Sequence, residues 1–481
     1  MPKRSSPRKT KIVATIGPAS DTAETLEAMI QAGMSVARLN LSHGTLDEHK
    51  GRLERIRRAA RALDTQVAIM IDTRGIEVRT GRISVGSVEL VCGGNFTLYT
   101  DGRPGTGDGV SVTYQRLALE LNPGDTILLD DGAMELTVQS LTEREIRCRV
   151  VVGGTLRESK GVNLPDTQLS VTAVDPENRD DVVRELTFAA ENDVEYIAAS
   201  FIQSADDVNH MREILLSNGV DIPIIAKIEN RAGMDNLEAI VAAADGIMVA
   251  RGDLGVELPM ADVPGMQKRM IRTTVSNGKP VITATQMLAS MERNPKPTRA
   301  EASDVANAIL DGSSAVMLSG ETAAGSYPVV AVKTMAELAV RTEASLREYG
   351  YLQHILPHPS NVVTEAVSHA AVRMADQLGA TAIITLTETG FTSRLISKHR
   401  PECPILAVTA SPKVACRLCM NWGVIPILYQ DKHLDDARID FAIKQATKRG
   451  IVKAGDILVA TAGHSQTTGG TNSIRVLSVE H

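Results

Sequence analysis

The sequence predicts an α/β protein: a parallel TIM (β/α)8 barrel with a β-rich domain inserted into it and a smaller α/β domain after it. Three observations predict this fold. Strand-like and helix-like segments alternate eight times, a stretch rich in turns interrupts them after the third strand, and a second alternation follows from about residue 361. Alternating β and α segments indicate a parallel sheet. Eight such units with one insertion are typical of a barrel that carries a second domain.

Size and composition exclude several classes of protein. The chain has 481 residues, enough for roughly two to four domains and a large core. Aromatic residues make up 3% of it and the net charge is −7, so we expect no nucleic-acid partner and no membrane partner. The basic segment 3–11 has no apolar run behind it, and no apolar run approaches membrane-spanning length. Five cysteines, an odd number, favour a reducing compartment, and we expect a cytoplasmic protein.

Turn and capping residues delimit the barrel segments. The apolar run 11–17 ends at a glycine, and the next helix has Asp21 at the expected N-cap position with Glu24 three residues later, a capping-box pattern. The eight predicted strands start near Ile12, Val36, Ala68, Tyr196, Ile222, Gly246, Pro280 and Ala315. Helices are predicted between them, among others at 46–63, 179–192, 237–244, 264–277 and 300–310. A doubly wound open sheet is the alternative, but no GxGxxG follows the first strand.

Two further regions complete the chain. Residues 81–164 are rich in Gly, Val, Thr and turn pairs, which predicts short antiparallel strands with little helix. After residue 361 the alternation predicts a separate α/β domain whose last strand is DILVATAG. Within it Cys416 and Cys419 form a CxxC pair. We expect a plain helix face there, because no second pair or histidine lies at zinc spacing.

Polar side chains lie at the ends of nearly all the predicted barrel strands. By the two-residue period of a strand, Lys227 and Glu229 share one face. One such pair by itself fits a structural ion pair as well as an active site. Many of them at one barrel end indicate a site, because burying unpaired charges is costly and TIM barrels carry their chemistry at this end. The strand-end residues are Arg38, Asn40, Ser42, Asp72, Thr73, Lys227, Glu229, Arg251, Gly252, Asp253, Thr283, Thr285, Ser319 and Glu321.

The residue types at these ends indicate phosphoryl transfer. Glu229 and Asp253 are hard oxygen ligands suited to a Mg²⁺ that keeps waters and takes substrate oxygens. Arg38, Lys227 and Arg79 supply cations for a phosphate or a carboxylate. An oxygen-bearing group of modest charge, suited to a monovalent cation, consists of Asn40, Ser42, Asp72 and Thr73. Cations and a divalent metal with no nucleophile–base dyad are typical of phosphoryl-transfer sites, and the P-loop motif GxxxxGK[ST] does not occur.

Longer stretches of the sequence resemble one family, pyruvate kinase. They run in the family's order over almost the whole chain: KIVATIGPAS, ARLNLSHG, DTRGIEVRTG, KGVNLP, AKIEN, DGIMVARGDLGVE, ITATQML, PTRAEASDVANAILDG and MLSGETAAGSYP. The resemblance implies a barrel domain A at 1–80 and 165–345, an inserted β-barrel lid domain B at 81–164, and a C-terminal α/β regulatory domain C at 346–481. It also implies a glycolytic homotetramer that transfers the phosphoryl group of phosphoenolpyruvate to ADP, giving pyruvate and ATP.

The family's residue roles carry over at matching positions. Lys227 matches the lysine that stabilises the phosphoryl group in transfer, and Thr285 matches a residue close to the face where the enolate is protonated. Glu229 and Asp253 match the ligands of Mg²⁺ or Mn²⁺. The other matches are Arg38, Gly252, Asp253 and Thr285 for the substrate, Asn40, Ser42, Asp72 and Thr73 for K⁺, and Arg79, Lys160 and Asn40 for the nucleotide.

Several positions depart from the family pattern. Arg74 and Ile76 stand where the family usually has Lys and Pro. Gln203 replaces a usual Arg, and Ala232 replaces a usual polar residue. None of the four is a matched ligand, so the departures concern lid-hinge and loop geometry. Glu77 resembles the glutamate of the potassium-dependent members, and we expect K⁺ dependence.

A phosphate site is expected in the C-terminal domain. Residues 387–392, TETGFT, precede a predicted helix whose N-terminus can seat a phosphate, and a simple N-cap fits these residues equally well. The resemblance places the family's effector loop here. It implies activation by a sugar monophosphate or AMP through Thr387, Thr389, Gly390 and Thr392.

Two other functions compete with this interpretation. A Mg²⁺-dependent barrel lyase or aldolase would share the Glu229–Asp253 metal pair but would need no nucleotide lid, so the insertion and Lys160 argue against it. A non-catalytic metabolite sensor on the same fold would not need Lys227 and Thr285.

Overall fold

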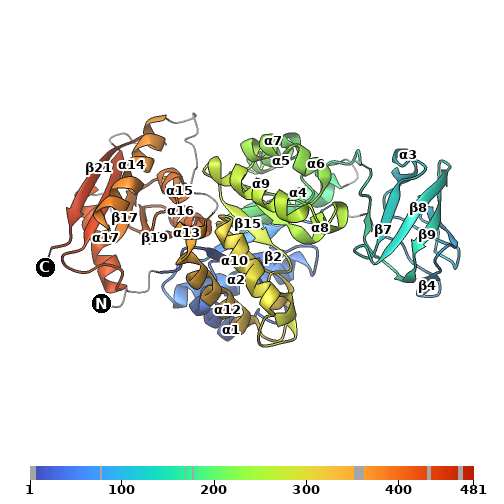
Figure 1. The fold of residues 1–481 in the computed structure, drawn as a ribbon, viewed down its shortest axis with the longest axis horizontal. Coiled ribbons are helices and arrows are strands. Elements are labelled where there is room, and N and C mark those ends of the chain that lie inside the picture. The colour runs from blue at the N-terminus through green and yellow to red at the C-terminus, as the bar shows by residue number, and fades with distance from the viewer. Residues whose placement is uncertain are drawn as a thin grey trace.

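The computed structural model describes residues 7–75, 78–167, 169–175, 178–350, 362–430, 435–463 and 470–480. The molecule is elongated, with the barrel in the middle and the other two parts at opposite ends (Figure 1). Within these ranges, none of the helices combines the length and the apolar composition that a membrane crossing requires.

Eight parallel strands close into a barrel in the order β1-β16-β15-β14-β13-β12-β3-β2, which confirms the predicted fold. Each strand starts within two residues of its predicted position. The β-rich part is inserted after β3, between the neighbouring barrel strands β3 and β12. The strands are β1 (Lys11–Thr15), β2 (Val36–Asn40), β3 (Ala68–Asp72), β12 (Tyr196–Ala199), β13 (Ile224–Ile228), β14 (Gly246–Ala250), β15 (Val281–Ala284) and β16 (Ala315–Leu318).

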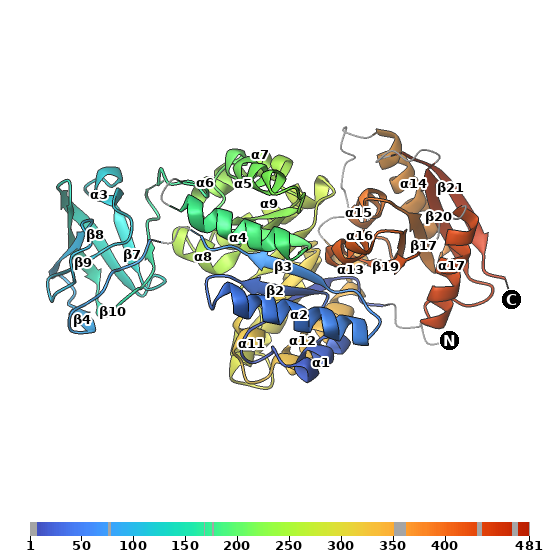
Figure 2. The same cartoon turned by 180° about the vertical axis from the view of Figure 1, so that it is seen from behind.

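Helices cover the outside of the barrel, and α1, α2 and α12 pack together on one side of it (Figure 2). The helices of this part are α1 (Ala23–Ala32), α2 (Leu46–Ala62), α4 (Arg179–Glu191), α5 (Ala205–Ser217), α6 (Arg231–Asp235), α7 (Leu237–Ala243), α8 (Arg251–Glu257), α9 (Val263–Ser276), α10 (Arg299–Leu310), α11 (Gly320–Ala323), α12 (Pro328–Glu343) and α13 (Leu346–Tyr349), with the 3₁₀ turn η1 (Ala289–Glu292).

The cap of the first helix differs from the sequence prediction. Thr22, not Asp21, is the N-cap of α1: its backbone is extended and its hydroxyl accepts a hydrogen bond from the Thr25 N–H at 3.2 Å. The Asp21 carboxylate instead lies 3.4 Å from the guanidinium groups of both Arg52 and Arg55 on α2. The predicted N-cap was wrong by one residue because two adjacent residues can both cap a helix, and neighbouring arginines occupy the aspartate.

The two faces of each barrel strand contribute to different cores. Residues such as Met70, Met248 and Met317 point inward and fill the barrel, and the residues between them pack against the helices. Burial on both faces explains why the strands are almost continuously apolar. Along most of these strands, the first inward-facing polar side chains are therefore those at the carboxyl end, where the inner layer stops.

The inserted part has a core of its own and is curled from two sheets. A six-stranded sheet has the order β11-β7-β8-β9-β5-β6, and β10 pairs with β4 in a second sheet. Most of the pairings are antiparallel, as predicted, but β5 and β6 pair in parallel. The elements are β4 (Ser87–Leu90), β5 (Asn95–Tyr99), β6 (Gly109–Ser111), α3 (Leu117–Glu120), β7 (Thr126–Leu129), β8 (Met134–Leu141), β9 (Glu145–Val152), β10 (Gly154–Arg157) and β11 (Val162–Asn163).

The C-terminal part is a five-stranded sheet in the order β19-β18-β17-β20-β21 with helices against it. The last strand, β21, was not predicted, and it pairs antiparallel with β20. The elements are α14 (Val362–Leu378), β17 (Ala382–Leu386), α15 (Phe391–Lys398), β18 (Ile405–Thr409), α16 (Pro412–Arg417), η3 (Leu418–Met420), β19 (Val424–Leu428), α17 (Asp435–Lys448), β20 (Ile457–Gly463) and β21 (Thr471–Ser478).

The C-terminal part closes the end of the barrel that lies away from the strand carboxyl ends. Cys419 and Met420 of η3 join the residues that fill the barrel interior. The hydroxyl of Tyr196, at the start of β12, donates to the carbonyl oxygen of Arg417 at 2.6 Å. Burial raises the pKa of Cys419 and of its CxxC partner Cys416 to about 12, so both remain thiols at neutral pH. The CxxC pair therefore belongs to an interface between the two parts.

A buried ion pair in the C-terminal part gives a test of its stability. Lys398 Nζ lies 2.8 Å from Glu365 Oε1, with side-chain exposures of 0% and 3%. Glu365→Ala leaves the ammonium buried without a carboxylate, and we expect a loss of about 3–5 kcal/mol in the stability of this part. Urea unfolding followed by the fluorescence of Trp422, the single tryptophan, measures this loss.

The matched control is the double variant Glu365→Leu with Lys398→Met, which replaces the pair by apolar side chains of similar size. We expect it to unfold at a higher urea concentration than Glu365→Ala. A single variant as stable as the parent protein would contradict the argument.

Candidate active site

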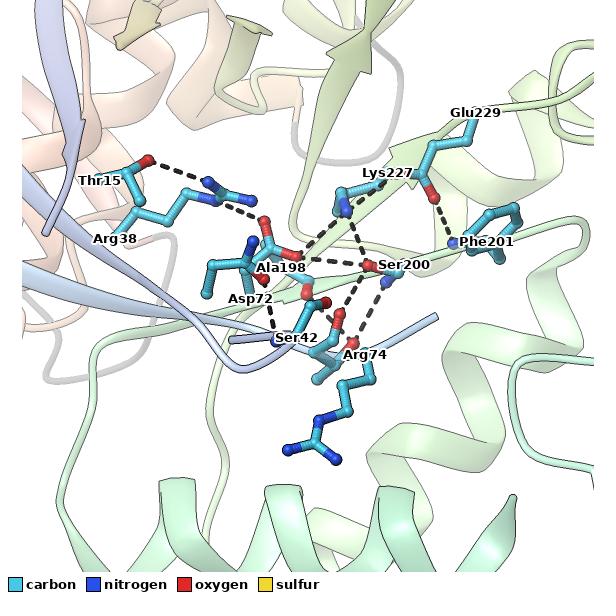
Figure 3. Close-up of polar contacts among 12 residues, drawn as sticks. Thr15, Arg38, Ser42, Asp72, Arg74, Ala198, Ser200, Phe201, Lys227 and Glu229 are labelled. Carbon is cyan, nitrogen blue, oxygen red and sulfur yellow. Dashed lines mark hydrogen bonds and ion pairs between the residues drawn. The ribbon is translucent and has the colours of Figure 1, made fainter. Parts of the chain in front are cut away.

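Side chains from four barrel strands meet in a buried charge cluster at the strand carboxyl ends (Figure 3). Arg38 Nε on β2 donates to Asp72 Oδ2 on β3 at 2.6 Å, and Lys227 Nζ on β13 lies 3.1 Å from Asp72 Oδ1. The same Nζ lies 2.8 Å from Glu229 Oε1 and donates to Ser200 Oγ, just after β12, at 2.7 Å. The exposed fractions of Asp72 and Glu229 are 1% and 2%. Two cations and two anions thus balance each other within the mouth of the barrel.

The charges of the cluster fix one another's protonation. Burial by itself raises the pKa of Asp72, but Arg38 and Lys227 outweigh it and hold that pKa below its usual value. Burial likewise lowers the pKa of Lys227, but Asp72 and Glu229 outweigh it and raise that pKa above the usual lysine value. Lys227 is therefore a permanent cation at neutral pH. It is suited to binding anionic oxygens and not to acting as a base.

Both oxygens of the Glu229 carboxylate are held in place. Oε1 faces Lys227, and Oε2 accepts a hydrogen bond from the backbone N–H of Phe201 at 2.7 Å. Phe201 has a φ of +55°, a left-handed conformation that is uncommon for an aromatic residue. A Cβ at Gly75 would lie 2.1 Å from the Phe201 ring, so glycine is required at that position. These contacts orient a carboxylate that lies almost entirely out of solvent.

The donor set at this end fits a hard cation that keeps some ligands other than protein. In the part of the chain that the structure describes, no three His, Cys, Asp or Glu side chains gather as a closed metal site. Glu229 and Asp253 supply carboxylate oxygens from neighbouring strand ends, β13 and the start of α8 after β14. Two carboxylates and open positions are the usual arrangement for Mg²⁺.

The oxygens predicted for a monovalent cation lie together at the ends of β2 and β3. Asn40 and Asp72 are directly paired across these strands. The Asn40 side-chain oxygen accepts a hydrogen bond from the Ser42 N–H at 3.2 Å. Ser200 donates from its backbone N–H to Thr73 Oγ1 at 3.3 Å and from its hydroxyl to the Thr73 carbonyl oxygen at 2.8 Å. Asn40, Asp72 and Thr73 therefore lie beside the charge cluster, and Ser42 contacts Asn40 through its backbone N–H.

Gly252 and Thr285 contact each other on the opposite side of the mouth. The Gly252 N–H donates to Thr285 Oγ1 at 2.8 Å, and the Thr285 hydroxyl donates to the carbonyl oxygen of Ala284 at 2.7 Å. Asp253 follows Gly252 in the first turn of α8. A hydrogen bond thus joins the segments that follow strands β14 and β15.

A cleft of about 580 Å³ lies between the inserted part and the barrel. Lys160 Nζ lies 2.8 Å from Asp130 Oδ1, and Arg79 Nη1 donates to the carbonyl oxygen of Ser159 at 2.8 Å. Lys160 therefore lies on the wall that the insertion contributes, and Arg79, just before the insertion begins, lies beside it. The lining also includes Gln203, Ala232, Asp253 and Glu257 from the barrel side.

Thr283 and Glu321, which also lie at strand ends, make contacts away from the charge cluster. Thr283 points to the outer face of β15, where its Oγ1 lies 2.7 Å from Ser313 Oγ. Glu321 accepts hydrogen bonds from the backbone N–H groups of Leu288 and Ser319 at 3.0 and 2.7 Å, which stabilises a loop. The predicted gathering of strand-end polar side chains at the mouth does not include these two. Thr283 directly precedes the inward-facing Ala284, so its side chain points to the opposite face of the strand. The Glu321 carboxylate is already hydrogen-bonded to two backbone amides.

Thr15, Ser200 and Phe201 join the cluster although none of them was predicted as a site residue. Thr15 Oγ1 accepts a hydrogen bond from Arg38 Nη1 at 2.9 Å, and Ser200 and Phe201 contact Lys227 and Glu229. All three lie at or just after the end of a barrel strand. The pattern that selected the other residues would have found Thr15 and Ser200, whereas Phe201 acts through its backbone and has no signal in the sequence.

The residues that depart from the family pattern have contacts of their own. Arg74 donates from its backbone N–H to Glu185 Oε2 at 3.0 Å and from Nε to the carbonyl oxygen of Leu41 at 2.7 Å. Gln203 Nε2 donates to the carbonyl oxygen of Val171 at 2.9 Å. Ile76 and Glu77 lie outside the described residues.

The predicted effector residues lie apart from this site, in the C-terminal part at the other end of the molecule (Figure 1). Thr387 Oγ1 accepts a hydrogen bond from the Gly390 N–H at 2.9 Å, and Gly390 has a φ of +81° at the start of α15. Thr392 Oγ1 lies 2.6 Å from Thr471 Oγ1 on β21, and Thr389 is exposed.

Comparisons with known proteins agree with this geometry. Residues 7–332 match the family model "Pyruvate kinase, barrel domain", and residues 365–477 match "Pyruvate kinase, alpha/beta domain". The chain is 46% identical over 475 residues to a pyruvate kinase of Bacillus licheniformis and 45% identical over 473 residues to one of Geobacillus stearothermophilus. Each alignment covers 98% of this chain and 80% of the relative.

A solved structure shares the whole architecture. The crystal structure of a pyruvate kinase from Cryptosporidium parvum superposes with a TM-score of 0.91 at 40% sequence identity, covering 98% of this chain and 96% of that one. Matches to both family models, near-complete coverage at this identity and the strand-end cluster together show that the chain belongs to the pyruvate kinase family.

Proposed function

We propose that this chain transfers the phosphoryl group of phosphoenolpyruvate to ADP and that the resulting enolate is protonated to pyruvate. The observation that carries the proposal is the position of Lys227. It is a buried, permanently charged ammonium, held by Asp72, Ser200 and Glu229, at the carboxyl ends of the barrel strands and in one cluster with Arg38. Cations fixed in place before the reaction stabilise charge on a phosphoryl group without having to reorganise.

The other side chains divide the remaining tasks. Arg38 and Lys227 bind phosphate oxygens, and the turn at Gly252 and Asp253 orients the substrate carboxylate. The Thr285 hydroxyl lies close to the face where the enolate carbon takes its proton. Arg79, Lys160 and Asn40 bind the phosphates of the nucleotide, with the lid domain at 81–164 covering it.

Two cation sites complete the proposal. Glu229 and Asp253 would hold Mg²⁺ or Mn²⁺, and the bound ion would neutralise charge on the phosphate oxygens. Asn40, Ser42, Asp72 and Thr73 would hold K⁺. The observation that supports the second site is that the amide oxygen of Asn40, the carboxylate of Asp72 and the hydroxyl and carbonyl oxygens of Thr73 lie near one another at the ends of β2 and β3.

The first test is Lys227→Met. We expect the rate of pyruvate formation from phosphoenolpyruvate, ADP, Mg²⁺ and K⁺ to fall on the order of 10³-fold or more, because the main cation at the transferring group is removed. A coupled assay for pyruvate measures the rate, and the same assay without ADP separates this reaction from that of a lyase.

Lys50→Met is the matched control, since Lys50 is an exposed lysine on α2. It should keep the parent rate. A Lys227→Met enzyme as active as this control would refute the proposed role, and pyruvate formation without ADP would refute kinase activity.

The second test removes potassium. Replacing K⁺ by tetramethylammonium at constant ionic strength should lower the rate roughly tenfold or more, equivalent to about 1.4 kcal/mol of barrier. Steady-state rates in the two buffers check this, with Mg²⁺ saturating in both. Equal rates would show that the oxygen group around Asp72 holds no functional cation.

We also propose that a phosphorylated metabolite activates the enzyme through Thr387, Thr389, Gly390 and Thr392, in an enzyme that is a homotetramer like its family. The loop between β17 and α15 supports this proposal. Gly390 adopts a left-handed conformation there, and the hydroxyls of Thr387 and Thr392 lie beside the start of α15. Backbone N–H groups and hydroxyls at a helix start bind phosphate well. Light scattering of the purified enzyme would contradict the tetramer if it gave the mass of one chain.

The third test replaces Thr387 and Thr392 by valine, one at a time. Each change removes a hydrogen bond to a charged phosphate, worth about 1.5–3 kcal/mol, so the concentration of glucose 6-phosphate or AMP for half-maximal activation should rise roughly tenfold or more. Thr447→Val on the exposed face of α17 is the control. Unchanged activation curves in both variants would disprove the site.

A further inference from the structure

The loop after β15 contains the most unusual backbone at the barrel mouth. Thr285 and Gln286 are consecutive and have φ values of +65° and +52°. The left-handed region is costly for any residue with a Cβ and most costly for a β-branched one such as threonine. Such a conformation persists only where the surroundings hold it.

The side chain of Arg251 supplies that hold. Its Nη2 donates to the carbonyl oxygen of Thr285 at 2.7 Å, and its Nε donates to the carbonyl oxygen of the preceding residue, Ala284, at 3.2 Å. Nη2 also lies 2.8 Å from Met287 Sδ. One planar guanidinium therefore binds the carbonyl oxygens on both sides of the Thr285 Cα, those of Ala284 and Thr285. It also contacts Met287, the residue after Gln286.

The guanidinium is itself fixed from the helix side. Nη1 lies 2.7 Å from Asp304 Oδ1 on α10 and 3.5 Å from Gln267 Oε1 on α9. The side chain of Arg251 is 11% exposed. Arginine can make this set of contacts because its donors form a rigid fork, which the single ammonium of lysine cannot reproduce.

The hold also connects two residues of the proposed site. Arg251 is followed directly by Gly252, whose N–H donates to Thr285 Oγ1 at 2.8 Å. Two adjacent residues after β14 thus bind the Thr285 loop: Arg251 through its side chain and Gly252 through its backbone N–H. Arg251 makes these contacts to the backbone of the Thr285 loop, and it has no part in binding substrate in the proposal above.

We propose that Arg251 is a positioning residue for the enolate-protonation half of the reaction: it keeps Thr285 in the left-handed conformation that fixes the position of the threonine hydroxyl at the barrel mouth. This rests on the proposed function, which places Thr285 at the face where the enolate carbon takes its proton. Phosphoryl transfer depends on Lys227 and Arg38, which lie on β13 and β2 and are held by Asp72, Glu229, Ser200 and Thr15. The two half-reactions should therefore respond differently to changes at Arg251.

The experiment compares Arg251→Lys and Arg251→Met with the parent enzyme. The first readout is the exchange of pyruvate methyl protons with D₂O, measured by NMR in the presence of ATP, Mg²⁺ and K⁺. This exchange should slow roughly tenfold or more in both variants, a change of about 1.4 kcal/mol in its barrier. The KM for phosphoenolpyruvate should change much less than the exchange rate. Arg269→Lys on α9, which makes the same substitution in an exposed pair with Glu238, is the matched control and should exchange normally.

A rescue separates positioning from general stability. Glycine adopts positive φ without a Cβ penalty, so Gln286→Gly should let the loop keep its conformation with less support. Added to Arg251→Met, it should restore part of the lost exchange rate. Normal exchange in Arg251→Met would overturn the inference, and so would exchange, KM and thermal stability that fall together with no rescue by glycine.

A threonine variant separates the proposed role of Thr285 from that of Arg251. Thr285→Val should slow the exchange as the arginine variants do. If Thr285→Val exchanges at the parent rate, the role proposed for Thr285 fails, and the inference fails with it. If Thr285→Val is slow and Arg251→Met is normal, the proposed function stands and only the role of Arg251 is wrong.

Discussion

The buried carboxylate of Asp72 is the group on which the mouth of the barrel depends. One of its oxygens binds Arg38 and the other binds Lys227, so two cations that would repel each other are held close together out of solvent. In a medium of low dielectric constant, such a cluster is stable only when its charges balance. The three residues come from β2, β3 and β13, which the closed barrel places around one opening. The charge balance therefore exists only in the closed barrel.

Strand β12 links this cluster to the other end of the barrel. At its start, the Tyr196 hydroxyl donates to the carbonyl oxygen of Arg417 in the C-terminal part, and just after its end Ser200 contacts Lys227 and Asp72. One short strand thus contacts the C-terminal part at its start and the charge cluster just after its end. The proposed regulation has to connect these two regions. Physical continuity permits coupling, and an element with two discrete arrangements would have to carry it.

Much of the fold could be predicted because a barrel strand is buried on both faces. Its sequence is therefore an apolar run that ends in polar residues. The strands began where the runs predicted, and the cluster residues Arg38, Asp72, Lys227 and Glu229 were all selected by their place at strand ends. The sequence pattern was weak for segments whose side chains are not buried. Strand β21 lies at a sheet edge with most of its side chains partly or fully exposed, so it has no apolar run to mark it.

The sequence by itself determined the order of the elements, the barrel, the insertion point and the types of side chain available at the mouth, because all of these follow from local periodicity and from family-specific stretches. Only the tertiary structure decided which of those side chains meet. It turned Thr283 and Glu321 to structural contacts, recruited the Phe201 N–H for Glu229, and placed Arg251 against the Thr285 backbone. Most of these contacts join side chains to backbone N–H or C=O groups, which nearly every residue type has, so no pattern of side chains along the sequence can reveal them.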